Sequence, residues 1–346
     1  MRHRQFIPSL TLAALLFVAV MPSRAADPDL LAQARQVFKP LPVDAATAEN
    51  PLTPEKIRLG RLLFFEPRVS ADGTVSCARC HQPALYGTDA LPKSIGAAYR
   101  THPRHAQTVL NAAIQFVQHW RGDRVSVEDQ AIKALIAPPA YGHTNYDAAL
   151  AKIKAVPGYP ELFASAFPGQ AEPVTADNWG KAIGAYVRTL LTRAPLDAFL
   201  SGDTNALSAT AQAGLRTFIR VGCVGCHHGV GIGGGMYQKF GITEDYWNAT
   251  HSAVVDKGRF EVTQNPSDLY VFKVSSLRNV AMTPPYFHDG SVATLPMAVR
   301  VMGRVQLGKT LTDTEVDEIV AFLHTLTGPL PANFATMPAL PPGSAR

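Results

Sequence analysis

Apolar residues recur at helical spacing along most of this chain, with polar residues between them. In the last such stretch, one face of a helix carries Val316, Ile319, Val320, Leu323 and Leu326. Gly328 and Pro329 follow and end that helix. The same spacing predicts helices over 57–65, 109–120, 127–136, 147–156, 178–191, 209–221 and 297–305. Few stretches alternate as strands do, so the pattern predicts a mainly α fold.

Three segments interrupt this pattern and suggest how the chain is divided. Residues 86–107 are rich in Gly, Pro and His, and we expect a long ordered loop of the kind that usually has a function. Turn and helix-cap signals lie between residues 195 and 210. We therefore place one domain at 26–195 and a second at 196–330. The remaining 331–346, rich in Pro and Ala, is expected to be a loose tail.

Residues 1–25 have the pattern of a secretory signal peptide. Arg2 and Arg4 precede an apolar stretch at 7–20, and the small residues Ser23 and Ala25 mark a cleavage site. We expect export to the periplasm and a mature chain that begins near residue 26. An uncleaved anchor is the alternative, but the apolar stretch is shorter than the roughly 20 residues of a spanning helix. No other stretch is apolar enough, so we expect no membrane span after cleavage.

The composition fits a globular protein and weakens one class of function. The chain has 346 residues, 47% hydrophobic and 17% charged, which suffices for about two domains. Its formal charge is +5, and three of the cations, Arg2, Arg4 and Arg24, lie in the signal segment, which has no acidic residue. Removing that segment leaves 5 − 3 = +2. We therefore expect no nucleic-acid partner.

All four cysteines lie in two Cys-x-x-Cys-His units. In c-type haem attachment, the two thiols bond to the porphyrin vinyl groups and the adjacent His binds the iron from one side. A zinc site or a redox dithiol could use the same cysteines, but neither needs a His directly after each second Cys. The two haems expected here are held by Cys77, Cys80 and His81, and by Cys223, Cys226 and His227. No thiol is left for a disulfide.

The sixth ligand of each iron decides whether the haem carries electrons or reacts. A Met thioether closes the iron and raises its potential, whereas an open position admits peroxide or oxygen. The candidate thioethers are Met236, Met282, Met297 and Met302. A Met at helical spacing, as Met302 is, is more often part of a core than a ligand. The spacing alone therefore leaves this ligand open.

Several runs of residues resemble the bacterial di-haem cytochrome c peroxidases and their MauG-type relatives, over nearly the whole chain after the signal. They occur in the same order as in that family, which makes a chance likeness negligible. The runs are Leu59 to Arg68, Leu91 to Gly96, Thr108 to Asn111, Tyr270 to Lys273, Ser276 to Val280, Thr283 to Gly290, Val301-Met302 and Gln306 to Gly308.

The resemblance implies two cytochrome-c-like domains, each with one covalently bound c-type haem. It implies that the second haem has a high potential, with His227 and Met302 as axial ligands, and accepts electrons from a small cytochrome c or a copper protein. Hydrogen peroxide is then expected to react at the first haem, held by His81. The other site residues implied are Trp120 between the haems, Gln130 in the peroxide pocket and His288 near the second haem and the domain interface.

The chain departs from the family at the position that caps the first haem. The family usually carries a His there, which leaves the iron when the second haem is reduced. Counting from Gly96, this position is Ala97, which cannot ligate iron. We therefore expect an open first haem. His102 and His105 lie in the same loop and are the alternative caps.

A second departure concerns the acid–base group of the peroxide pocket. The family uses a glutamate to move a proton from one peroxide oxygen to the other. The corresponding stretch here, 137–143, contains no carboxylate. Tyr141 or His143 takes the role, or no residue does.

A third departure concerns calcium. Family members bind the ion between the domains through an Asn side chain and two backbone carbonyls. Thr283 and Pro285 match the carbonyl positions, but His105 stands where the Asn would be. Calcium prefers oxygen ligands to imidazole, so the sequence leaves calcium binding undecided.

Our leading hypothesis is a periplasmic di-haem peroxidase that reduces hydrogen peroxide with electrons from a small cytochrome c or a cupredoxin. A MauG-like oxidase of a protein or organic substrate is the second hypothesis, although that type carries a Tyr where this chain has Met302. The third is a non-catalytic electron carrier or sensor. The family commonly forms homodimers, but the sequence itself identifies neither the donor nor the oligomeric state.

Overall fold

The computed structural model describes residues 28–343, so the predicted signal peptide lies outside the described residues. The fold is mainly helical, as predicted, with one small antiparallel pair of strands. The elements are α1 (Pro28–Val37), α2 (Pro54–Phe64), α3 (Cys77–Cys80), α4 (Val127–Ala134), α5 (Tyr146–Ala155), α6 (Tyr159–Ala166), α7 (Ala176–Val187), α8 (Pro195–Ser201), α9 (Ala209–Val221), β1 (Tyr237–Lys239), α10 (Tyr246–Thr250), α11 (Phe260–Thr263), β2 (Val271–Lys273), α12 (Leu295–Leu307), α13 (Asp313–His324) and α14 (Ala332–Ala335).

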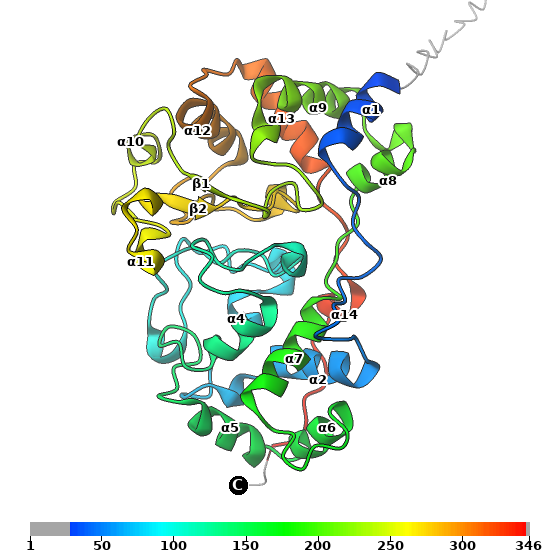
Figure 1. Ribbon diagram of the computed structural model, residues 1–346, viewed down its shortest axis with the longest axis vertical. Helices are drawn as coiled ribbons and strands as arrows, with labels where there is room; N and C mark the ends of the chain where they lie inside the picture. Colours follow the sequence, from blue (N-terminus) through cyan, green and yellow to red (C-terminus); the bar gives the residue numbers. More distant parts are fainter. Residues whose placement is uncertain (1–27, 344–346) are drawn as a thin grey trace, which may run out of the picture.

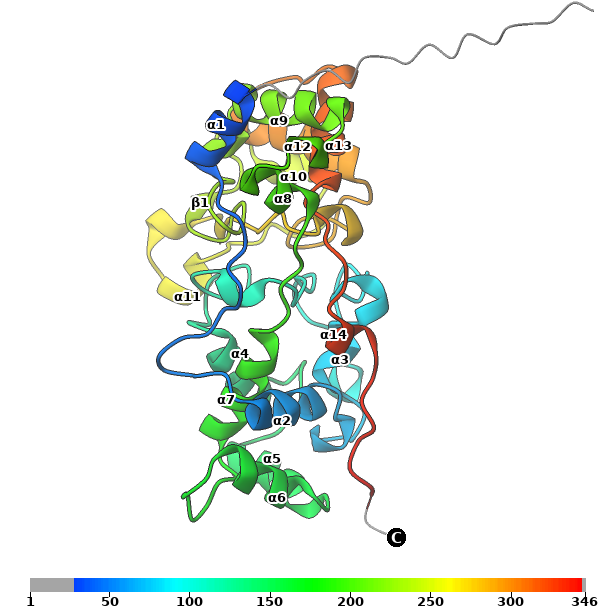
Figure 2. The same ribbon diagram turned by 90° about the vertical axis from the view of Figure 1, so that its right-hand side faces the viewer.

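The molecule has two lobes stacked along its long axis (Figure 1). One hydrophobic core lies among α2, α4, α5, α6 and α7, in what we call the first lobe. A second core lies among α8, α9, α12 and α13, in the second lobe. Three chain segments cross between the lobes along one side, after α1, after α7 and after α13 (Figure 2).

Each lobe contains two helices that cross in contact with each other. A glycine at each crossing lets the two backbones approach closely, because it has no side chain. In the first lobe α2 crosses α7, and a Cβ atom on Gly60 would lie 1.8 Å from the carbonyl oxygen of Ala182. In the second lobe α9 crosses α13, and a Cβ atom on Gly214 would lie 1.8 Å from the carbonyl oxygen of Glu318. A Cys-x-x-Cys-His unit follows the first helix of each pair. The two lobes thus repeat one arrangement.

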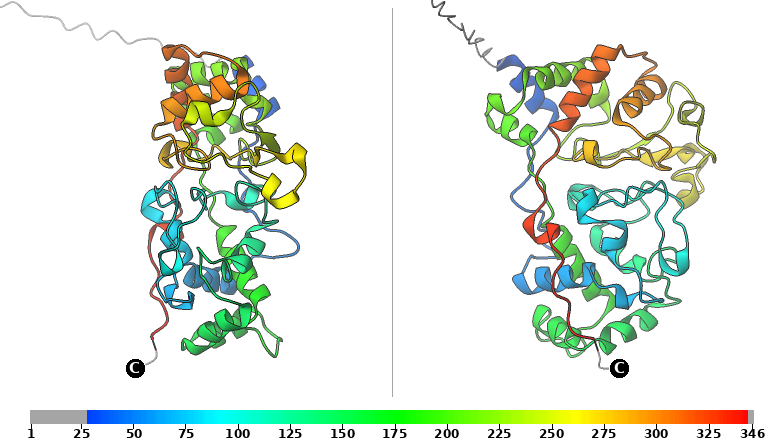
Figure 3. Two further views of the ribbon diagram at one scale, coloured as in Figure 1. Left: turned by 90° about the vertical axis from the view of Figure 1, so that its left-hand side faces the viewer. Right: turned by 180° about the vertical axis from the view of Figure 1, so that it is seen from behind.

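Both ends of the described chain pack differently from the sequence prediction. Helix α1 was assigned to the first domain, but Phe38 just after it is buried in the second core against Phe218 and Phe322. The tail was expected to be loose, but Phe334 is buried in the first core and Arg61 donates to the Thr336 carbonyl at 2.8 Å. Figure 3 shows this tail running along the first lobe. Each end therefore ties one lobe to the other, and the boundary near 195 stays a prediction.

The predicted helix over 109–120 is wrong. This segment is irregular except for one 3-10 turn at Ala112–Ile114, because Asn111 and His119 have positive φ angles of 57° and 65°. The Asn111 side chain is hydrogen bonded to Thr192, at 2.7 Å through the hydroxyl and 2.9 Å through the backbone N–H. These contacts hold the chain out of a helix, and helical periodicity cannot reveal them. Helix α6 was missed.

None of the helices in residues 28–343 combines the length and hydropathy that a membrane crossing needs.

Candidate functional site

The first Cys-x-x-Cys-His unit forms helix α3 and ends at His81. Cys77, Cys80 and His81 line one cavity, which we call the first cavity. The Nδ1 atom of His81 lies 3.0 Å from the carbonyl oxygen of Gly87. A carbonyl can only accept, so Nδ1–H donates and the lone pair stays on Nε2. Burial lowers the pKa of His81 and favours this neutral form, which is the form that ligates a metal.

The second unit repeats this chemistry immediately after α9. Cys223, Cys226 and His227 line another cavity, the second cavity, inside the second lobe. The Nδ1 atom of His227 lies 3.3 Å from the carbonyl oxygen of Ile232, which again leaves the lone pair on Nε2. Burial lowers the pKa of His227 to about 4. Each cavity therefore brings together two thiols and one imidazole with a free lone pair.

The structure separates the four candidate methionines. Met302, on α12, lines the second cavity together with His227. Met282 and Met297 are exposed, at 41% and 51%, and they do not line this cavity. Met236 does not line it either. Of the four, Met302 is thus the thioether placed to bind a group held by His227.

Trp120 lies in the wall of both cavities. Its indole N–H donates to the carbonyl oxygen of His105 at 2.8 Å, and its own carbonyl accepts from the Lys273 backbone N–H at 2.7 Å. Its ring packs edge-on against His288, with centroids 6.3 Å apart. Trp120 is therefore a fixed aromatic ring between the two cavities.

His288 is almost fully buried and lines the second cavity without facing the first. Its ring stacks on Phe272 at a centroid distance of 4.5 Å. Its Nε2 atom lies 3.7 Å from a carboxylate oxygen of Asp256 and has no hydrogen-bond partner among residues 28–343. Burial lowers the pKa of His288 and favours the neutral ring.

Three residues considered above as the cap or the acid–base group of the first haem do not line the first cavity. Ala97 is buried, and its N–H donates to the Ala140 carbonyl at 3.0 Å. The Tyr141 hydroxyl lies 3.4 Å from the Cys77 sulfur. His143 uses Nε2 to donate to the Val69 carbonyl at 2.6 Å. Neither Tyr141 nor His143 thus lines the cavity where the acid–base group was expected.

Gln130, His102 and His105 do line the first cavity. The side-chain oxygen of Gln130 is buried without a hydrogen-bond partner in the described part of the chain. The same holds for Nε2 of His102. His105 instead uses Nδ1 to donate to the Leu91 carbonyl at 2.7 Å.

The residues matched to a calcium site lie beside the second cavity. Thr283 and Pro285 both line it, and the bond between Pro284 and Pro285 is cis. His105 donates its backbone N–H to the His288 carbonyl at 2.8 Å, which joins the two lobes here. Residues 28–343 contain no cluster of three or more His, Cys, Asp or Glu side chains arranged to hold a metal ion.

The sequence reasoning missed Lys273, which lines both cavities and is almost fully buried. Its ammonium group donates to the Gln115 side-chain oxygen. Burial lowers the pKa of Lys273 to about 7. A lysine between Phe272 and Val274, in a predominantly apolar run, was the signal available in the sequence.

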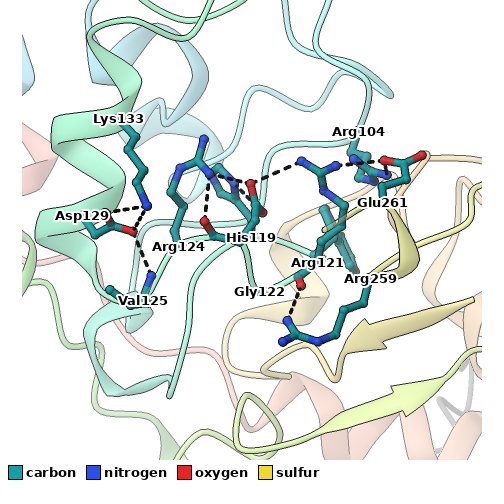
Figure 4. Close-up of polar contacts among 12 residues, drawn as sticks. Arg104, His119, Arg121, Gly122, Arg124, Val125, Asp129, Lys133, Arg259 and Glu261 are labelled. Carbon is teal, nitrogen blue, oxygen red and sulfur yellow. Dashed lines mark hydrogen bonds and ion pairs between the residues drawn. The ribbon is translucent and has the colours of Figure 1, made fainter. Parts of the chain in front are cut away.

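An ionic network between the lobes was also missed (Figure 4). Arg104 of the first lobe donates twice to Asp256 of the second, at 2.6 and 2.7 Å, and once to Glu261 at 2.9 Å. Arg121 also donates to Glu261 at 2.9 Å, and Arg259 donates to the Arg121 carbonyl at 3.1 Å. This network lies where both lobes approach Trp120 and helps to fix their relative position. Charge patterns along the chain give no sign of such distant pairs.

Comparisons with known proteins agree with this geometry. The profile of the family described as "Di-haem cytochrome c peroxidase" matches residues 54–205. The chain is 39% identical to cytochrome c551 peroxidase of Pseudomonas aeruginosa, with 98% of this chain and 97% of that protein covered. It is 40% identical to cytochrome c551 peroxidase of Nitrosomonas europaea, with 88% and 87% covered.

Among solved structures, the fold is similar to that of a MauG-like protein associated with microbial copper homeostasis. The TM-score is 0.74 at 28% identity, with 84% of this chain and 94% of that chain covered. Two observations lead to one conclusion. The chain is about 40% identical to two peroxidases over most of its length, and each of its two cavities is lined by a Cys-x-x-Cys-His unit. This chain belongs to the di-haem cytochrome c peroxidase family and is an oxidoreductase with two haem cofactors.

Proposed function

We propose that this protein is a periplasmic peroxidase that reduces hydrogen peroxide to water with electrons from a small cytochrome c or a cupredoxin. The observation that carries the proposal is the position of Trp120 in the wall of both cavities. Two relatives that cover most of the chain are named cytochrome c551 peroxidase, which supports peroxide as oxidant and a cytochrome as donor. The predicted signal peptide supports the periplasmic location.

The residues present fit two covalently attached haems. Cys77 and Cys80, and likewise Cys223 and Cys226, would bond to the vinyl groups, and the adjacent His of each unit would ligate the iron. Lys273, buried between the cavities, would pair with a propionate of either haem. Haem iron supplies the redox chemistry of such sites, because it takes up single electrons and binds small ligands at an open axial position.

At the second cavity, His227 and Met302 would hold the iron of a bound haem, and with both ligands in place peroxide would be excluded. A thioether ligand raises the potential of a haem, so this is where we place the uptake of electrons from the donor. Trp120 would then carry electrons toward the first cavity. Its hydrogen bonds to His105 and Lys273 keep its ring fixed between the cavities.

At the first cavity, His81 would bind the iron and Gln130 would face the peroxide. Ala97 stands at the expected cap position and packs away from the cavity, so peroxide would bind without prior reduction of the second haem. The overall reaction takes up two electrons and two protons for each peroxide and releases two molecules of water. Two one-electron donors per peroxide therefore complete a turnover.

The test is steady-state peroxide reduction by the purified holoprotein with a reduced cytochrome c. We expect turnover by the wild type and a loss of at least about tenfold in Met302→Ala and Trp120→Phe, if each removes about 1.4 kcal/mol or more of barrier lowering. Trp247→Phe is the matched control, because Trp247 packs against Tyr246 and Tyr270 and lines neither cavity. Unchanged rates in Trp120→Phe would contradict the electron route.

Two other functions are outcomes of the same test. An absence of turnover in the wild type would indicate an electron carrier or sensor. Rapid oxidation of both haems by peroxide without need of a cytochrome, followed by oxidation of a protein substrate, would indicate an oxidase of the MauG type. The fold similarity to a MauG-like protein makes this oxidase the second candidate, and the Met302 thioether is the observation against it.

Three finer proposals have direct tests. Haem that stays with the polypeptide in acidic acetone would establish covalent attachment. The carbonyl oxygens of Thr283 and Pro285 are the proposed calcium ligands, and metal analysis before and after chelation tests them. Sedimentation of the holoprotein tests the proposed homodimer.

A further inference from the structure

His102 places an unpartnered imidazole nitrogen in the wall of the first cavity. Its Nε2 atom is buried and has no hydrogen-bond partner within residues 28–343. The nearby Pro139 backbone favours the protonated ring of His102, but burial has the larger effect on its pKa. Nε2 is thus a ring nitrogen that no described residue engages, and in the neutral ring it can carry the lone pair. Burial lowers the pKa of His102, so the neutral ring predominates at pH 7.

The segment that His102 contacts is the one that lacks the family's carboxylate. Pro139 belongs to the stretch 137–143, and both Pro139 and Ala140 line the first cavity. Gln130 and Ser94 each add an unpartnered side-chain oxygen to the residues of this cavity. Tyr141 and His143 do not line the cavity. His105, His119 and Asp123 line it as well, but His105 and His119 use Nδ1 in hydrogen bonds to Leu91 and Asp123. Of these histidines, His102 is the one with a buried ring nitrogen that has no partner in the described part of the chain.

The loop that carries His102 is fixed to the same segment. Ile95 pairs with Thr101 in an antiparallel bridge, and the His102 N–H donates to the Ser94 carbonyl at 2.8 Å. A Cβ atom on Gly96 would lie 1.6 Å from the Pro139 carbonyl oxygen, so the two backbones touch. An imidazole on a fixed loop is suited to a permanent acid–base role rather than to that of a removable cap.

We propose that His102 is the distal proton-transfer residue of the first cavity. The proposal rests on the peroxidase function proposed above. With haem held by His81, Nε2 of His102 would accept a proton from hydrogen peroxide and return it to the oxygen that leaves as water, and the haem would supply the electrons for O–O cleavage. Two electrons from the donor and two protons from solvent convert the remaining oxygen to water.

The experiment compares His102→Gln, His102→Ala and His102→Glu with the wild-type holoprotein. Stopped-flow mixing with peroxide gives the rate of its first reaction, and we expect a loss of about 10²–10⁴-fold in His102→Gln and His102→Ala. His102→Glu restores a carboxylate base and should recover part of this rate. His143→Gln is the matched control and should leave the rate unchanged, because His143 does not line the cavity.

Cyanide binding to the ferric protein is the second measurement and needs no turnover. Hydrogen cyanide loses a proton as it binds, so removal of a distal base should slow its association. Faster association in His102→Ala, with conversion of a low-spin to a high-spin haem in the EPR spectrum, would show that His102 is an iron ligand and overturn the proposal. Unchanged peroxide and cyanide rates in His102→Gln would also overturn it. Failure of the peroxidase function would instead appear as a wild type without cytochrome-dependent turnover, whatever the cyanide result.

Discussion

Arg278 and Asp197 form a buried ion pair that joins helix α8 to the wall of the second cavity. Their side chains are 0% and 5% exposed, and two contacts of 2.9 Å connect them. Asp197 also accepts the backbone N–H groups of Leu41 and Ala194 at 2.8 Å each. Arg278 donates to the Val230 carbonyl at 2.6 Å. Four segments far apart in the chain thus meet at one ion pair.

Replacing Arg278 with Met should strongly lower the free energy of unfolding. The substitution leaves the Asp197 carboxylate buried and without its counter-ion, and removing one partner of a buried pair costs about 3–5 kcal/mol. For domains of 150–250 residues each kcal/mol shifts Tm by about 2–4 °C, so we expect Tm to fall by about 6–20 °C. Thermal and urea unfolding, followed by circular dichroism, measure the change.

Arg304→Met is the control for burial. Arg304 makes two contacts of 2.6 Å to Glu244, but its side chain is 61% exposed. Exposed pairs contribute about 0–1 kcal/mol, so this variant should unfold close to the wild type. The reasoning is refuted if Arg278→Met loses no more stability than Arg304→Met while its haem spectrum is intact.

Three further predictions follow from other contacts. Met302→His should lower the reduction potential of the second haem by about 0.1 V or more, which lies within the roughly 0.8 V that axial ligands span. Spectroelectrochemical titration measures this potential. An unchanged potential would exclude Met302 as a ligand. Gly214→Ala should lower the free energy of unfolding by about 1–3 kcal/mol or more, because the new Cβ atom would lie 1.8 Å from the Glu318 carbonyl oxygen. Gly235→Ala is the control. Its Cβ atom would have no neighbour within 4 Å, so this variant should unfold like the wild type. Burial alone would raise the pKa of Glu128. Hydrogen bonds from Arg188 and Asn50 outweigh this effect, so the pKa of Glu128 lies below its ordinary value. The stability that ionised Glu128 contributes is therefore present above the unfolded pKa of about 4.3, and it is lost as the pH falls through the lower folded pKa. Urea unfolding at pH 5 and at pH 3 measures this loss. The free energy of unfolding should fall more between these pH values for the wild type than for Glu128→Gln.

Helix prediction from the sequence succeeded where one face of a helix is buried along its whole length. The helix over 209–221 was predicted with its observed bounds, because Ser208 caps its start and Gly222 ends it. The prediction over 109–120 failed because Asn111 bonds to Thr192, which is 81 residues away. The same contact pattern recurs in the second lobe, where Asn279 donates to Thr192 at 2.9 Å.

The sequence by itself determined the cofactor chemistry, because two thiols and an imidazole within five residues belong to one local unit. It also identified the missing carboxylate of 137–143, which is a matter of residue type alone. The tertiary structure decided which of the four methionines lines the same cavity as His227, and that Trp120 lines both cavities. It also decided that His102 lines the first cavity with an unpartnered ring nitrogen, whereas Tyr141 and His143 do not line that cavity. Which residues line each cavity depends on how distant segments of the chain pack. Spacing along the chain cannot predict this, because it does not encode the contacts between the two lobes.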